Sequence, residues 1–451
     1  MTSSKSYWPA LLGASASVMV AGAAQGQVWR VHEPHVLGAS LDMAIVADHP
    51  GSALAAARAA RAEIDRLDAV LSRWRTDSEL TAFNTGQGVA PSPDLLAVIQ
   101  AAEHWRRATN GAFDAQLGLT DGALDLDGVG KGHVIDAALA AARRAAPDLA
   151  GMMIDIGGDL RVWGQAPSAQ GWRVGVADPR RLADNAEPLQ ALWLNDKAVA
   201  FSGPGLRGDH ILDPRTGNPA RGVSAAVVAS TARDADALAT ALCVMSPADG
   251  LALTDRLDGF EALLIDENGR RLPSRGWNAL TAQDPPARLI RAQNPQGPAW
   301  PSGFSVNVNY EVPVIPRDRA QPPYIAFWIT DQTGAPIRTL AILGTDLRFI
   351  DQNFIWWRRV GRTLGSVDTI ARPTRRPGHY NIAWDGRDDK GQMLGQGRYT
   401  LHIEATREHG GHSYQTFDMS LGPGALTATA AADEELGATT VRYGPRAGGG
   451  A

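Results

Sequence analysis

Residues 122–136 combine acidic, basic and glycine residues at a spacing that suits the binding of an anion. Asp125 and Asp127 alternate with leucines, which predicts a short strand. A turn is expected next, formed by Gly128, Gly130 and Gly132 with Lys131 among them. A helix is expected from about 133 to 146, and the free N–H groups and positive dipole at its start would favour a diphosphate. The pattern matches neither common nucleotide-binding glycine motif, so an ordinary strand-to-helix turn is the structural alternative.

Two polar residues on a later helix form a second candidate group. Asp236 and Thr240 stand four residues apart in 234–242, where helical spacing places their side chains on one face. Their structural alternative is a capping acid and a hydroxyl that bonds back to the carbonyl four residues earlier. Upstream, His210 precedes a turn in which Asp213 is expected to be structural, because Asp, Pro and Gly are ordinary turn formers.

Composition limits the classes of protein to which the chain can belong. Its 451 residues, 44% of them apolar, exceed one ordinary domain, so two or three are expected. The formal charge is −5 with no dominant basic block, which argues against nucleic acid as a partner. The single cysteine, Cys243, lies in an apolar run and is expected to be a core residue.

The first 26 residues have the pattern of a secretory signal peptide. Lys5 precedes a mostly small and apolar stretch from 8 to 24, with small residues suited to cleavage near Ala23 or Gly26. No later stretch approaches about 18 uninterrupted apolar residues, so no transmembrane segment is expected. No cysteine follows the apolar run, which argues against a lipobox anchor. The mature chain is therefore expected to be exported, and periplasmic in a Gram-negative source.

The periodicity of apolar residues changes along the chain. Extended structure is expected at 28–47, and long helices at 52–74 and 93–110. Around 281–301 the composition shifts to Pro, Gln, Asn and Ala, which is typical of a linker. Strand-and-turn patterns after it predict a β-sandwich of about 120 residues. The predicted divisions are a signal peptide at 1–26, a first domain at 27–283, a linker at 284–304, the sandwich at 305–422 and a disordered tail at 423–451.

Four segments, in their order along the chain, resemble the FAD:protein FMN transferase (ApbE) family. They are the loop from Trp74 to Asn84, the stretch from Asp125 to Gly132, Ile156-Gly-Gly-Asp159, and His210-Ile-Leu-Asp-Pro-Arg-Thr-Gly217 followed by Ala235 to Thr240. The resemblance covers about residues 28–281 and implies an α+β, T-fold-like flavin transferase domain. Residues after about 305 resemble an uncharacterised periplasmic domain sometimes fused to this transferase, and 384–400 is similar to the Ig-like domain of flagellar hook-capping proteins. The expected fold class is therefore α+β followed by an all-β, Ig-like sandwich.

The resemblance implies a specific reaction and a set of site residues. FMN would pass from FAD, the substrate, to a Thr or Ser hydroxyl of another exported protein, with release of AMP. Mg²⁺ is the implied cofactor, and oxygen atoms are the ligands that it prefers. Carried over by position, the implied metal ligands are the side chains of Asp236 and Thr240 and the backbone carbonyl of Gly128. The implied contacts to FAD come from Leu37, Trp74, Ala112, Phe113, Asp114, Asp125, Lys131 and Leu212.

His210 is the expected catalytic residue, beside the transferred phosphate. It either removes the proton of the acceptor hydroxyl, because the ordinary pKa of imidazole suits a base near neutral pH, or only orients the reacting groups. The chain departs from the family pattern in a short loop at 200–208 and at Leu37, Trp74, Asp127 and Asp155. Asp127 either points inward, where it would bind a cation or repel FAD, or points outward into solvent.

Three functions follow from these patterns. FMN transfer is the main prediction, and FAD hydrolysis to FMN and AMP is an alternative that needs the same metal with water in place of the hydroxyl. The third is a catalytically decayed flavin-binding or scaffold protein whose sandwich carries the function. No acceptor signature, an Asp-Gly or Asp-Ala shortly before Thr/Ser-x-Thr, occurs in the chain, so self-flavinylation is not expected.

Overall fold

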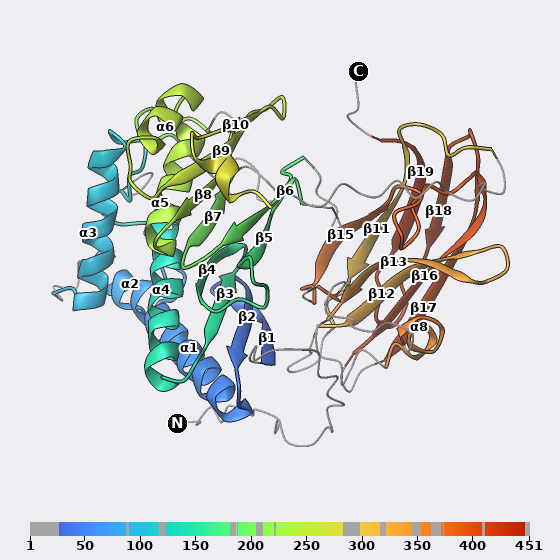
Figure 1. The fold of residues 1–451 in the computed structure, drawn as a ribbon, viewed down its shortest axis with the longest axis horizontal. Coiled ribbons are helices and arrows are strands. Elements are labelled where there is room, and N and C mark those ends of the chain that lie inside the picture. Colours follow the sequence, from blue (N-terminus) through green and yellow to red (C-terminus); the bar gives the residue numbers. More distant parts are fainter. Residues whose placement is uncertain are drawn as a thin grey trace.

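The computed structural model forms two bodies, each with its own hydrophobic core (Figure 1). The first body lies within residues 27–282 and the second within 298–446. The expected signal peptide, most of the expected linker and His210 lie outside the described residues. The structure describes residues 27–86, 90–116, 123–180, 186, 188–203, 211–220, 222–282, 298–315, 322–344, 352–361, 371–372, 374–407 and 411–446.

An eight-stranded antiparallel sheet forms the centre of the first body, in the order β1-β2-β3-β4-β7-β8-β9-β10. Every residue of β8 is buried, because both faces of the sheet are covered. The strands are β1 (Gln27–Val36), β2 (Ala39–Ala47), β3 (Gly151–Ile156), β4 (Asp159–Gly164), β7 (Ala198–Ser202), β8 (Ser224–Ala229), β9 (Glu261–Ile265) and β10 (Arg271–Pro273).

Helices cover the face of this sheet that lies away from the second body (Figure 1). They are α1 (Pro50–Leu71), α2 (Glu79–Asn84), α3 (Pro93–Ala108), α4 (Asp127–Ala145), α5 (Ala232–Val244) and α6 (Pro247–Thr254). A hairpin of β5 (Trp172–Val176) and β6 (Gln190–Leu194), with the 3-10 helix η2 (Trp277–Leu280), covers the other face. The expected extended segment and the two expected long helices correspond to β1 with β2, α1 and α3, and are confirmed.

Helix α4 begins at Asp127, six residues before the start that the glycine pattern predicts, and residues 123–126 form no strand. The prediction of a strand and a glycine turn is therefore wrong. Gly128 and Gly132 lie in the first two turns of α4, where their missing side chains let the helix cross α5 at short range. A Cβ added to Gly132 would lie 2.6 Å from the Cα of Arg233, a distance at which one helix must move.

A carboxylate on α4 fixes the beginning of α5. Asp136 accepts hydrogen bonds from the backbone N–H groups of Ala232, at 2.9 Å, and Arg233, at 3.1 Å. An anion at a helix N-terminus satisfies donors that have no partner within the helix and interacts favourably with the helix dipole. Thr231 caps the same end by accepting from the N–H of Asp234. The position of α5 relative to α4 is thus set at the turn that precedes Asp236.

Two sheets pack face to face in the second body, in the orders β15-β11-β19-β18 and β14-β13-β12-β16-β17. Helix α8 (Phe354–Arg359) covers the outer face of the five-stranded sheet through Trp356. The strands are β11 (Phe304–Val312), β12 (Tyr324–Asp331), β13 (Pro336–Leu343), β14 (Ala371–Arg372), β15 (Gly378–Trp384), β16 (Gly397–Thr406), β17 (His412–Leu421), β18 (Leu426–Ala430) and β19 (Thr439–Pro445).

Most of the expected disordered tail is part of the sandwich. Within 423–446, β18 and β19 form, and β19 pairs with β11 in the interior of the four-stranded sheet. The prediction of disorder from Gly and Ala content is wrong because β19 alternates buried and exposed residues, with Val441 and Tyr443 in the core. Residues 447–451 lie outside the described part of the chain.

Candidate active site

The α4–α5 crossing brings together the three residues that the resemblance assigns to a metal. A Cβ added to Gly128 would lie 3.2 Å from Oγ1 of Thr240 and 3.1 Å from Cε2 of Phe113, so the first turn of α4 touches α5. One turn further on, the backbone N–H of Gly132 donates to Oδ2 of Asp236 at 3.2 Å. Residues more than 100 positions apart in sequence therefore line one small region, with oxygen atoms facing it.

Thr240 also makes the bond to the carbonyl four residues earlier that a purely structural role predicts. Its Oγ1 donates to the backbone carbonyl of Asp236 at 3.1 Å, four residues earlier. The same oxygen lies 3.5 Å from Oγ of Ser202, the last residue of β7. A hydroxyl that donates its proton to a carbonyl keeps its lone pairs available for another partner. The back-bond is therefore compatible with a ligand role for the Thr240 oxygen.

Burial of acidic groups gives this region its electrostatic character. Asp236 is 4% exposed, and burial, with the charge of Asp159 as the second cause, raises the pKa of Asp236 to about 7. Lys131 and the Gly132 N–H oppose this rise. The Lys131 ammonium lies 2.6 Å from Oδ2 of Asp159, which is 1% exposed and also accepts from the N–H of Phe201 at 2.9 Å. Lys131 thus stands between two buried acids.

The donor atoms fit a hard divalent cation. Asp236 contributes a carboxylate whose raised pKa reflects a buried negative charge with too little compensation, and a cation in contact with it would supply that compensation. Thr240 adds a neutral oxygen, and the Gly128 backbone lies beside it. Within the described ranges, no three His, Cys, Asp or Glu side chains converge on one point. A cation at this crossing would therefore depend on one carboxylate together with neutral oxygens.

Arg73 connects the acidic stretch to an exposed aromatic ring. Its guanidinium forms an ion pair with Asp125, and its Nε lies 3.5 Å from Oδ2 of Asp127. The Asp127 side chain is 55% exposed, and its charge is close enough to contribute to the raised pKa of Asp236, so it matches neither the inward nor the solvated alternative alone. The ring of Trp74 is 76% exposed, with the Arg73 guanidinium 4.5 Å from its centroid. Arg73 and Trp74 thus offer a cation and a flat apolar surface to a ligand with aromatic rings.

The remaining residues expected to contact FAD lie on turns of the first body, and of these Phe113 is in contact with the crossing. Ala112 and Phe113 are buried, and Asp114 accepts from the N–H of Gln116 at 2.9 Å. Leu37 adopts a φ of +49° in the tight turn between β1 and β2. Leu212 pairs with Pro219 across a short turn in which Asp213 bonds Arg215, so the structural role expected for Asp213 is confirmed.

Three residues with clear roles at this site had no assignment from the sequence. Arg73 neutralises Asp125, Asp159 holds Lys131, and Ser202 approaches Thr240. Asp159 does lie within a motif that carries the family resemblance, which is the one signal that could have identified it. His210, the expected catalytic residue, and most of the short 200–208 loop lie outside the described residues.

Comparison with known proteins identifies the family. Residues 37–120 and 118–264 match the model of the ApbE family, and together they span just over half of the chain. The chain belongs to the ApbE family. Residues 305–438 match a second family, described as a predicted periplasmic protein (DUF2271). None of the helices in the described part of the chain is both long and apolar enough to cross a membrane.

Relatives of this ApbE-family chain carry one enzymatic name. It is 27% identical over 264 residues to the FAD:protein FMN transferase of Vibrio cholerae, covering 45% of this chain and 78% of that protein. It is 27% identical over 284 residues to the FAD:protein FMN transferase of Treponema pallidum, covering 47% of this chain and 77% of the relative. The crystal structure of the ApbE protein from Thermotoga maritima aligns with a TM-score of 0.51 at 25% identity, covering 57% of this chain and all of that one. The first body therefore has the ApbE fold, followed by an all-β body.

An acid in the sheet of this ApbE-family chain should make stability depend on pH. Asp155 on β3 lies opposite Asp42 on β2. Burial raises the pKa of Asp155 to about 7, against the opposing hydrogen bond from Gly158 N–H at 2.8 Å. Because the unfolded chain releases this proton near pH 4, the native state loses stability as the pH rises from about 4 to 7.

Replacing Asp155 with asparagine, which keeps the acceptor oxygen for Gly158, should therefore raise the free energy of unfolding by about 2 kcal/mol at pH 8. Little change is expected at pH 4, where the folded wild type retains the proton. Urea titrations at both pH values would measure the difference. The exposed Asp258→Asn serves as the control, and an equal gain for Asp155→Asn at both pH values would contradict the assignment of the pKa.

Proposed function

We propose that this chain transfers FMN from FAD to a Thr or Ser hydroxyl of an exported acceptor protein and releases AMP, in a reaction that requires Mg²⁺. The observation that carries the proposal is the α4–α5 crossing, where Gly128, Asp236 and Thr240 converge beside Lys131 in a chain of the ApbE family. This one arrangement combines oxygen donors, the Lys131 ammonium and, through Arg73, the exposed ring of Trp74.

The side chains can be assigned separate tasks in this reaction. Lys131 and the start of α4 hold the negative charge of the diphosphate, and Arg73 keeps Asp125 in place next to it. Trp74 offers its exposed ring to an aromatic part of FAD. Asp236, Thr240 and the Gly128 carbonyl would hold Mg²⁺, which when bound neutralises charge on the phosphates.

The bonds made and broken define the role of His210. The acceptor oxygen forms a bond to the phosphorus of the FMN half, the bond from that phosphorus to the bridging oxygen breaks, and AMP leaves with the bridging oxygen. The hydroxyl proton must leave the acceptor oxygen during this step. We propose that His210 accepts it, since imidazole with an ordinary pKa is a suitable base near neutral pH.

We also propose where the reaction takes place and which residues carry it. The chain acts in the periplasm after removal of residues 1–26. The catalytic domain spans 27–283. The sandwich extends from 298 to about 446, so it begins before the expected linker limit of 304, with Trp300 in its core, and ends beyond the expected limit of 422. The acceptor is a separate exported protein.

One incubation separates the three candidate functions. The mature chain is mixed with FAD, Mg²⁺ and an acceptor domain that carries a threonine, and the products are analysed by mass spectrometry. A gain of one FMN by the acceptor supports transfer. Free FMN and AMP without acceptor modification would support hydrolysis, and intact FAD in a saturable complex would support a binding protein.

The variant His210→Ala should slow transfer by about 100-fold while FAD binding changes little, because general-base assistance acts on the chemical step. Stopped-flow transfer rates and isothermal titration with FAD give the two quantities. The transfer rate of the wild type should fall as the pH drops below about 6–7, where His210 becomes protonated, and the variant should lack this dependence. A loss of FAD affinity as large as the loss in rate would instead make His210 a positioning residue.

A further inference from the structure

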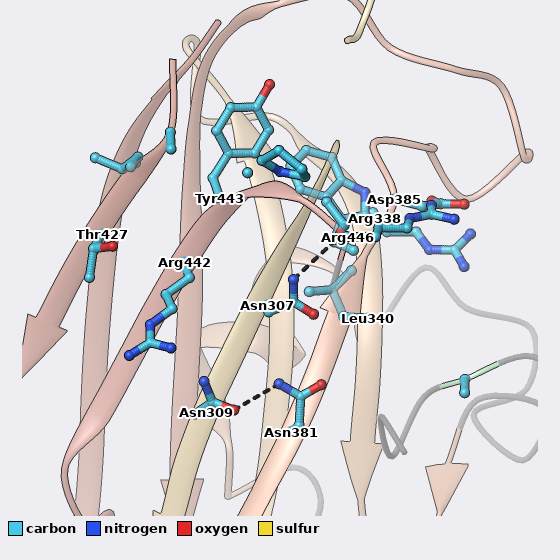
Figure 2. Close-up of a pocket in the computed structure, with 18 of the residues that line it drawn as sticks. Asn307, Asn309, Arg338, Leu340, Asn381, Asp385, Thr427, Arg442, Tyr443 and Arg446 are labelled. Atoms are coloured by element: carbon cyan, nitrogen blue, oxygen red, sulfur yellow. Dashed lines mark hydrogen bonds between the residues drawn. The ribbon is translucent and has the colours of Figure 1, made fainter. Parts of the chain in front are cut away.

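A cleft of about 660 Å³ lies on the outer face of the four-stranded sheet of the sandwich (Figure 2). Its floor is formed by β15, β11, β19 and β18. Along β11 the side chains alternate, so that Val306 and Val308 enter the sandwich core while Asn307 and Asn309 face the cleft. Arg180, from the connection between β5 and β6, also lines it. The cleft therefore lies where the sandwich faces the ApbE-family body.

The described residues that line the cleft carry a predominantly positive charge. Among the residues that the structure describes, four guanidinium groups line it, from Arg180, Arg338, Arg442 and Arg446, against the carboxylate of Asp385. Asp385 already has a partner, because its Oδ2 lies 3.4 Å from Nε of Arg387. Arg442 and Arg446 are exposed, and within the described ranges neither side chain forms a hydrogen bond or an ion pair. Two guanidinium groups are thus available to a ligand with carboxylates.

Amide side chains add a second kind of recognition to the cleft. Asn309 on β11 and Asn381 on β15 are paired in register, and Nδ2 of Asn381 donates to Oδ1 of Asn309 at 3.0 Å. Asn307 donates to Oγ of Ser305 at 3.1 Å (Figure 2). Each amide has further donor or acceptor capacity after these bonds are made. A polypeptide backbone, which presents N–H and C=O groups at regular spacing, matches a row of amides better than a bare phosphate does.

The dimensions of the floor limit the length of the ligand. Four strands at about 4.8 Å spacing make a floor about 14 Å across. An extended peptide rises about 3.3 Å per residue, so about four residues would span the floor. Guanidinium groups bind carboxylates in a planar, two-bond geometry that surface lysines lack.

We propose that this cleft binds a short, extended, acidic segment of the acceptor protein. The proposal rests on the proposed function, since it gives the sandwich the task of bringing an acceptor to the FMN transferase body. Arg442 and Arg446 bind the carboxylates of the segment, and the Asn307, Asn309 and Asn381 amides bind its backbone. Arg180 contributes from the catalytic body, so the acceptor segment lies between the two bodies.

Fluorescence anisotropy tests the binding step with the full mature chain. The probes are a fluorescein-labelled peptide with a run of Asp and Glu, and the same peptide with Asn and Gln in their place. The acidic peptide should bind the wild type, and the double variant Arg442→Gln/Arg446→Gln should weaken binding by about tenfold or more. The matched control Arg398→Gln removes an exposed arginine of β16, on the other sheet, and should leave binding unchanged.

Several results would overturn the proposal. Equal binding of the acidic and neutral peptides, or wild-type affinity in the double variant, would show that Arg442 and Arg446 do not bind carboxylates of the peptide. Binding of heparin that the acidic peptide does not displace would identify a polysaccharide site instead. Because both substituted arginines are exposed, thermal melting should show that the double variant retains the wild-type fold.

Failure of this proposal can be distinguished from failure of the FMN transferase assignment. With a threonine acceptor that carries the acidic segment, the double variant should raise KM for the acceptor and leave kcat unchanged. With an acceptor that lacks the segment, wild type and double variant should behave alike. Peptide binding should also persist in Asp236→Ala, so the cleft can be tested even if transfer is absent.

Discussion

Replacing Asp236 with alanine is expected to lower the rate of FMN transfer by about 100-fold. Losing a residue that only supports a metal ligand can already reduce activity by up to about 100-fold, and Asp236 is itself proposed as a ligand. Asp236 presents a buried carboxylate to the backbone N–H of Gly132 at the α4–α5 crossing, one helical turn before Thr240. If Mg²⁺ binds at this crossing as proposed, removing Asp236 leaves it only neutral oxygens. Initial rates measured across a range of Mg²⁺ concentrations should show that part of the lost activity returns as Mg²⁺ is raised.

Loss of the Asp236 charge should not unfold the chain, and the variant Asp236→Asn tests this. The raised pKa of Asp236 means that its ionised form is disfavoured in the folded chain without a cation, so Asp236→Asn should melt at or above the wild-type temperature in EDTA. Asp258→Ala, which removes an exposed acid outside the site, is the matched control for activity. Full transfer activity of Asp236→Ala at low Mg²⁺ would show that this carboxylate is not a metal ligand.

The second large effect is expected from Gly132→Ala. The added methyl group would lie 2.6 Å from the Cα of Arg233, and because that neighbour is backbone, α4 and α5 must separate. Overpacking of this kind costs about 3 kcal/mol, whereas the gain in helix propensity returns about 1 kcal/mol, so the variant should lose about 2 kcal/mol of stability. Displacing the Gly132 N–H from Asp236 should also reduce transfer by about 100-fold.

The matched control for this variant is two residues away on the same helix. A Cβ added to Gly130 would meet only the Cβ of Leu126, at 4.0 Å. Gly130→Ala should therefore gain up to about 1 kcal/mol from helix propensity and retain activity. Chemical denaturation and transfer rates of both variants measure the contrast. Equal stability of the two variants would contradict the close approach of α4 and α5.

Local patterns predicted the elements whose apolar residues repeat clearly. Ile64 and Leu67 follow helical spacing in α1, and the alternation in β1 and β2 predicted extended structure. The start of α4 was misjudged because glycines usually mark turns, whereas Gly132 serves a helix crossing that involves residues 100 positions later. A requirement set by a distant backbone leaves no signature in the local sequence.

The site was predictable only where the family resemblance supplied positions. Gly128, Asp236 and Thr240 converge, although no spacing rule connects residues so far apart. The pairing of Lys131 with Asp159 and the contact of Ser202 with Thr240 are tertiary contacts that local reasoning could not reach. The prediction of disorder for 423–451 is wrong for a different reason, because high Gly and Ala content obscures the alternation of buried and exposed residues in β19.

The proposed Mg²⁺ site at the α4–α5 crossing can be located by crystallography. Crystals of the mature chain with FAD and Mn²⁺ in place of Mg²⁺ would reveal the ion in an anomalous difference map. One peak is expected in contact with the Asp236 carboxylate, the Thr240 hydroxyl and the Gly128 carbonyl, next to the FAD diphosphate. A map with FAD bound and the Mn²⁺ peak elsewhere, or with no Mn²⁺ at the α4–α5 crossing, would contradict the proposed site.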